Sequence, residues 1–75
     1  MSEMDWKLVA EMRRRGVQEG TIEGLLLILV EAEETEAFLN WLAEQKTEPS
    51  ESEMVHKAKK IFLEMDPELT KETEI

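Results

Sequence analysis

The residue pair with the clearest chemical potential is Glu53 and His56, because a glutamate followed three positions later by a histidine is half of a carboxylate-bridged di-metal ligand set. Such a centre needs further ligands that face inward, and His56 is the only histidine of the chain. On a helix, both side chains point away from the apolar positions Met54, Ala58 and Met65. The spacing therefore predicts a surface role for the pair and no metal site.

A run of carboxylates in the middle of the chain could in principle support acid–base catalysis or bind calcium. Catalysis needs carboxylates in a desolvated cleft, and an EF-hand needs a glycine at a fixed place within a loop of about 12 residues. The sequence contains no such loop, so we interpret the run as a solvated acidic corner. The serines have no adjacent base and no glycine-flanked elbow. We therefore expect no enzyme activity, no catalytic residue, no cofactor and no small-molecule substrate. The carboxylate run that we interpret as an acidic corner consists of Glu31, Glu33, Glu34 and Glu36.

Three consecutive arginines, Arg13, Arg14 and Arg15, precede Gly16 and a second apolar segment, which is the outline of a helix-turn-helix. A recognition helix presents polar and basic side chains to DNA, whereas the segment that follows here presents leucines and glutamates. Arginines at a helix end also complement the helix dipole, and we favour that interpretation. DNA binding through the arginines stays as an alternative, although 18 acidic against nine basic residues disfavour a nucleic-acid partner.

The elements that must position these side chains are short. A chain of 75 residues forms one domain at most, and we expect residues 1–66 to form it and residues 67–75 to be an acidic tail with one extra turn at its start. There is no cysteine, which fits a reducing compartment, and no apolar stretch long enough to span a bilayer. We expect a cytoplasmic protein without membrane association.

The apolar periodicity predicts an all-α fold, a small bundle of four short helices at about 5–15, 20–33, 35–45 and 51–65, with the second at its centre. Gly16 and Val17 indicate the end of the first helix, and Thr35 is the expected N-cap of the third. Ser50 and Glu53 have the spacing of a capping box. No glycine or proline separates the second and third helices, so one kinked helix is an open alternative. Positions expected to form the core are Trp6, Leu8, Val9, Met12, Ile22, Leu25, Leu26, Leu29, Val30, Phe38, Leu39, Trp41, Leu42, Met54, Val55, Ala58, Ile61, Phe62 and Met65.

Residues 25–30 are apolar without interruption, so a helix through them is apolar around most of its circumference. Leu27 and Ile28 fall outside the predicted core stripe, and Leu63 lies opposite the stripe of the last helix. These three residues, with Trp41 at the margin, predict a partner-binding surface. The expected function is a small acidic protein–protein interaction module that binds a protein partner or a second copy as a homodimer. The net negative charge suggests an alternative function, that of an acidic regulator that occupies a basic nucleic-acid-binding site on a partner protein.

Overall fold

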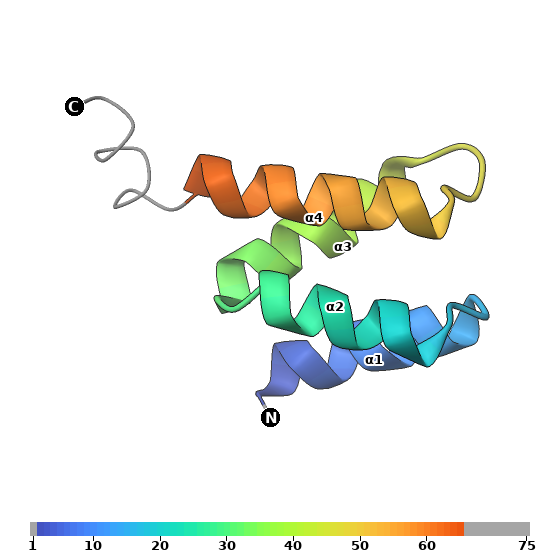
Figure 1. Cartoon of the computed structure of the whole chain (residues 1–75), viewed down its shortest axis with the longest axis horizontal. Coiled ribbons are helices and arrows are strands. Elements are labelled where there is room, and N and C mark those ends of the chain that lie inside the picture. Colours follow the sequence, from blue (N-terminus) through green and yellow to red (C-terminus); the bar gives the residue numbers. More distant parts are fainter. Residues whose placement is uncertain (1, 66–75) are drawn as a thin grey trace.

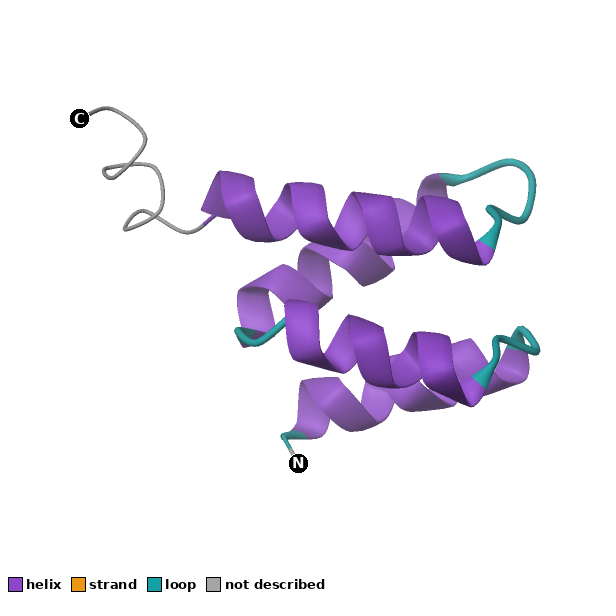
Figure 2. Ribbon diagram, viewed as in Figure 1, coloured by secondary structure: helices purple, strands orange, loops and turns teal. Residues whose placement is uncertain are grey.

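The computed structural model describes residues 2–65, which form four α-helices and no strand (Figures 1 and 2). The helices are α1 (Glu3–Arg14), α2 (Glu19–Ile28), α3 (Ala32–Glu44) and α4 (Glu51–Met65). The predicted all-α bundle of four short helices is confirmed. The acidic tail predicted for residues 67–75, with its extra turn, lies outside the described residues.

The bundle consists of two antiparallel helical hairpins, α1–α2 and α3–α4, stacked on each other. Figure 1 shows α1 and α3 running in one direction and α2 and α4 in the other. Helix α2 packs against α1 and α4, and α3 packs against the same two helices, whereas the backbones of α2 and α3 make no close approach to each other. The prediction that the second helix lies at the centre is therefore wrong, because each helix occupies one corner of the bundle and exposes an outer side.

One apolar core joins all four helices. Its side chains follow the predicted stripes, since each helix buries residues at a spacing of three and four. Three positions expected in the core are exposed instead: Trp6, Val30 and Met65. The buried apolar residues are Leu8, Val9, Met12, Val17, Ile22, Leu25, Leu29, Phe38, Leu42, Met54, Ala58 and Ile61.

Capping residues set most helix boundaries. Ser2 and Asp5 form a capping box at the start of α1, which the sequence analysis did not predict, and Ser50 and Glu53 form the predicted one before α4. At the end of α1, Gly16 has φ +78°, and the Val17 N–H donates to the Met12 carbonyl at 3.0 Å. This six-to-one hydrogen bond and the burial of Val17 are the features of a Schellman motif.

Helix α2 ends at Ile28 without a glycine, five residues before the predicted end at 33. Leu29 has φ −90° and ψ 78°, and the Val30 N–H donates to the Ile28 carbonyl at 3.2 Å. These values describe an inverse γ-turn, a conformation that any residue can adopt. The turn separates α2 from α3, so the two helices are distinct and the single kinked helix is excluded.

Two buried polar side chains stabilise this turn. The Glu34 carboxylate accepts hydrogen bonds from the N–H groups of Val30 and Glu31, each at 3.1 Å. The Thr35 hydroxyl donates towards the Leu29 carbonyl at 3.4 Å. Two expectations are corrected here: the N-cap of α3 is Glu31 rather than Thr35, and Glu34 is a buried part of the turn rather than a member of a solvated corner.

Candidate functional site

The four predicted partner-binding residues differ in exposure. Leu27 has the most exposed large apolar side chain among the described residues, at 80%, and Leu63 is 58% exposed. Ile28 is half-buried against the core. Trp41 is also half-buried. The centroid of its ring lies 5.7 Å from that of Phe38, and the angle between the two ring planes is 37°. Leu27 and Leu63 are therefore the two predicted residues that are freely available to a partner.

Two polar contacts show which neighbouring helix lies beside each side of α2. Glu19 pairs with Arg13 of α1, and Thr21 donates a hydrogen bond to Glu51 of α4. Residues seven apart on an α-helix lie on the same side, two turns apart. Ile28, seven after Thr21, therefore lies on the side of α2 that faces α4, and Leu26, seven after Glu19, lies on the side that faces α1. Leu27 is rotated by about 100° from Leu26. It points away from the buried Ile22, Leu25 and Leu29, on the outer side of α2.

The predicted residues consequently do not form one patch. Leu63 lies on the outer side of α4, opposite the buried Ala58 and Ile61. Trp41 lines a shallow groove between α3 and α4, with Lys57 beside it. Leu27, Leu63 and Trp41 thus occupy separate sides of the bundle.

Helix geometry places a second exposed apolar side chain, Trp6, at the level of Leu27 on the neighbouring helix α1. It is 58% exposed, and it lies seven residues before Arg13 on the same side of α1. Because α1 and α2 are antiparallel, Trp6 and Leu27 both lie two turns from the Arg13–Glu19 pair in the same direction, about 10 Å along the bundle. Val30, 62% exposed, follows at the end of α2. We call Trp6, Leu27 and Val30 the Trp6–Leu27 surface.

Trp6 was predicted to lie in the core, although the sequence contains a signal against that position. Trp6 precedes the buried Leu8 by two positions, which is a rotation of about 200° around the helix. Trp6 is therefore far from Leu8 around the helix, although it lies only about 60° from the buried Val9, whose spacing had suggested a core position. Val30 was missed because the helix was expected to continue through it, and no residue of the sequence marks the γ-turn before it.

Carboxylates surround the Trp6–Leu27 surface. Glu3 lies one turn before Trp6, Glu23 one turn before Leu27, and Glu31 directly follows Val30. All three glutamates are exposed, and none forms an ion pair within residues 2–65. The nearby basic residue, Lys7, lines a groove between α1 and α3 and thus faces another side. The apolar surface has an acidic rim.

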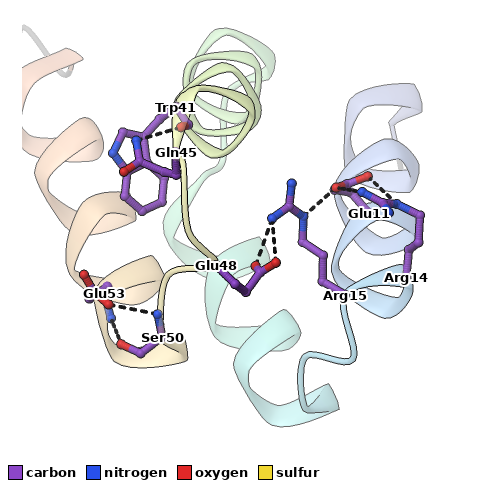
Figure 3. A network of polar contacts seen from close by, with 8 residues as sticks. All are labelled: Glu11, Arg14, Arg15, Trp41, Gln45, Glu48, Ser50 and Glu53. Carbon is purple, nitrogen blue, oxygen red and sulfur yellow. Dashed lines mark hydrogen bonds and ion pairs between the residues drawn. The ribbon is translucent and has the colours of Figure 1, made fainter.

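The three arginines are engaged by glutamates. Arg13 Nη2 lies 2.8 Å from Glu19. Figure 3 shows the other contacts, in which Arg14 Nη2 lies 2.6 Å from Glu11 and Arg15 bonds both Glu11 and Glu48. Hydrogen bonds from Arg14 and Arg15 hold the pKa of Glu11 below its usual value, and Arg13 does the same for Glu19. All three guanidinium groups therefore have carboxylate partners within the chain, and those of Arg13 and Arg14 stay largely exposed to solvent.

The Glu53 and His56 pair has the surface position expected of it. The Glu53 carboxylate accepts from the Ser50 N–H at 2.9 Å, and this bond lowers the pKa of Glu53. His56 is exposed on the outer side of α4. Within residues 2–65, no three histidine, aspartate or glutamate side chains are grouped closely enough to hold a metal ion.

Comparisons of the chain with protein-family models, with curated proteins and with solved structures find no match. Among the described helices, none combines the length and the apolar character needed to cross a lipid bilayer. The arrangement of charge and exposed apolar area around Trp6 and Leu27 is therefore the main guide to function.

Proposed function

We propose that this protein is a small acidic interaction module that docks a protein partner through the Trp6–Leu27 surface and catalyses no reaction. The observation that carries the proposal is the exposure of two large apolar side chains on the neighbouring helices α1 and α2, Trp6 at 58% and Leu27 at 80%. Tryptophan is enriched among the residues that dominate binding energy at interfaces, and apolar anchors of this kind define docking sites.

Burial of the two side chains would make a substantial apolar contribution to binding. Complete burial of a leucine contributes about 1.5–3 kcal/mol, and a tryptophan buries about 150–250 Å². The two side chains belong to helices that share one core, so little backbone conformational entropy is lost when a partner covers them.

A second candidate is an acidic regulator that occupies a basic nucleic-acid site. The net charge of −9 and the exposed carboxylates of Glu33 and Glu36 favour it. The burial of Glu34 reduces the acidic cluster on which that proposal rests. Binding of this second kind falls steeply as salt is raised, whereas apolar docking persists.

Selection of peptides from a random display library against the full chain separates the two candidates. We expect selected peptides to carry apolar residues and to lose binding to Leu27→Ser, while the matched variant Leu63→Ser retains it. Both substitutions remove an exposed leucine and leave the charge unchanged. Peptides that are purely polybasic, bind through Glu33 and Glu36 and dissociate in high salt would instead support the charge-based regulator. A selection without binders, together with a chain that stays monomeric at all concentrations, would contradict apolar docking.

A further inference from the structure

The outer side of α2 around Leu27 carries two glycines with open space beside them. Gly20 and Gly24 lie two turns and one turn before Leu27, and a Cβ placed on either glycine meets no heavy atom within 4 Å. A partner backbone can therefore approach α2 closely beside the two large anchors, as in helix-to-helix packing across small residues.

The mode of docking follows from the secondary structure. Addition of an extended peptide to a sheet needs an exposed strand edge, and residues 2–65 contain no strand. Trp6 and Leu27 belong instead to two neighbouring antiparallel helices, α1 and α2. An amphipathic helix laid along this surface, with anchors at i, i+3, i+4 and i+7, is the occupant that such a surface accommodates.

The charge of the rim selects among amphipathic helices. Glu3, Glu23 and Glu31 flank the apolar residues without ion-pair partners within residues 2–65, in a chain whose net charge is −9. Lysine or arginine on the edges of the occupant is attracted to these carboxylates, and an acidic occupant is repelled. A second copy of this chain would bring the same carboxylates together across a two-fold axis, which disfavours a homodimer.

We propose that the occupant of the Trp6–Leu27 surface is a cationic amphipathic helix of a partner protein, with an apolar face that covers Trp6 and Leu27 and basic residues that meet Glu3, Glu23 and Glu31. This inference rests on the proposed function and names the chemistry of its partner. The apolar contact supplies affinity, and the carboxylate rim supplies the choice between partners.

Three synthetic peptides of about 14 residues test the inference. The first has leucines at i, i+3, i+4 and i+7 with flanking lysines, the second replaces each lysine by glutamate, and the third has the composition of the first but no apolar face. The full chain with Trp41→Phe leaves Trp6 as the only indole, so its fluorescence reports binding at this surface. We expect the first peptide to bind at least about tenfold more tightly than either of the others, a difference of about 1.4 kcal/mol.

Charge reversal on the protein provides the matched comparison. Glu3→Lys with Glu23→Lys should shift the preference towards the acidic peptide. Glu36→Lys with Glu44→Lys changes the net charge equally at exposed positions of α3 and should leave the preference for the cationic peptide in place. Equal effects of the two double variants would show that only net charge matters and would overturn the inference.

The remaining outcomes separate this inference from the proposed function. Equal binding of the cationic and acidic peptides, lost in Leu27→Ser, would overturn the charge selection and leave apolar docking in place. Equal binding of the third peptide would overturn the helical occupant. A dimer in sedimentation velocity that Leu27→Ser dissociates would make the occupant a second copy. No binding of any peptide by a monomeric chain would overturn both proposals.

Discussion

Arg15 and Glu48, 33 positions apart in sequence, form a two-point contact in which Arg15 Nη1 lies 2.9 Å and 3.0 Å from the two carboxylate oxygens of Glu48 (Figure 3). The contact joins the end of α1 to the loop between α3 and α4. Glu51 adds a second link, since its carboxylate accepts hydrogen bonds from the Gln18 N–H and the Thr21 hydroxyl. This end of the bundle is held by polar contacts, whereas Trp6 and Leu27 are exposed towards the other end.

Arg15→Ala should destabilise the fold more than Arg13→Ala. The Arg15 side chain is 16% exposed and bonds two glutamates, whereas Arg13 and Glu19 form a solvent-exposed pair. We expect Arg15→Ala to lower the free energy of unfolding by about 1–2 kcal/mol and Arg13→Ala by about 0.5 kcal/mol or less. Urea denaturation followed by circular dichroism measures both. Equal losses would contradict the importance of the Arg15 link.

Glu11 should contribute to the dependence of stability on pH. Its pKa in the folded state lies below the ordinary value of 4.5, because Arg14 and Arg15 donate hydrogen bonds to its carboxylate. The unfolded state therefore binds the proton more tightly, so the contribution is complete above about pH 4.5 and is lost as the pH falls below it. The stability difference between the native chain and Glu11→Gln should be largest near neutral pH and shrink towards pH 3. Urea titrations at several pH values, with Glu44→Gln as a control outside any ion pair of residues 2–65, measure it. A difference that stays constant with pH would contradict this role.

Glu34→Ala should weaken the turn between α2 and α3. The substitution leaves the N–H groups of Val30 and Glu31 without their acceptor, at an expected loss of about 1–3 kcal/mol. Glu34→Gln retains an oxygen acceptor and should lose less. Thermal unfolding of both variants, beside Glu36→Ala at an exposed position, measures the effect. If Glu34→Ala and Glu36→Ala lose the same stability, the turn does not depend on the buried carboxylate.

Alanine substitutions should have opposite effects at different glycines. Gly16 has φ +78°, so alanine there should cost about 1–2 kcal/mol through steric strain. Gly20 lies within α2 with open space around its Cβ direction, and alanine should stabilise the helix by about 0.5–1 kcal/mol. Differential scanning calorimetry of the two variants measures both changes in stability. A stabilised Gly16→Ala variant would contradict the Schellman ending of α1.

The fold class and most helix boundaries could be predicted from sequence because their signals are local. The capping box at Ser50 and the stop at Gly16 each specify one backbone conformation, and the stripe of α4 has a regular period. The end of α2 could not be predicted, because an inverse γ-turn needs no special residue and depends on the buried Glu34 for stabilisation. A polar residue in an acidic run gives no local sign that it is buried.

The candidate site was predicted only in part for a related reason. Leu27 was identified because a helical period places it off the core stripe, and that rule is independent of the other helices. Trp6 comes from another helix, and its level relative to Leu27 depends on the antiparallel arrangement of α1 and α2. Leu63 fits the same local rule, but α4 presents it on a different side of the bundle.

The most direct test of apolar docking is the affinity of the cationic amphipathic peptide for two variants in the Trp41→Phe background, Leu27→Ser and Leu63→Ser, measured by Trp6 fluorescence. We predict that Leu27→Ser weakens binding by about tenfold or more, since burial of a leucine contributes about 1.5–3 kcal/mol, and that Leu63→Ser leaves it unchanged. Equal affinity of the two variants would contradict the assignment of the Trp6–Leu27 surface as the docking site.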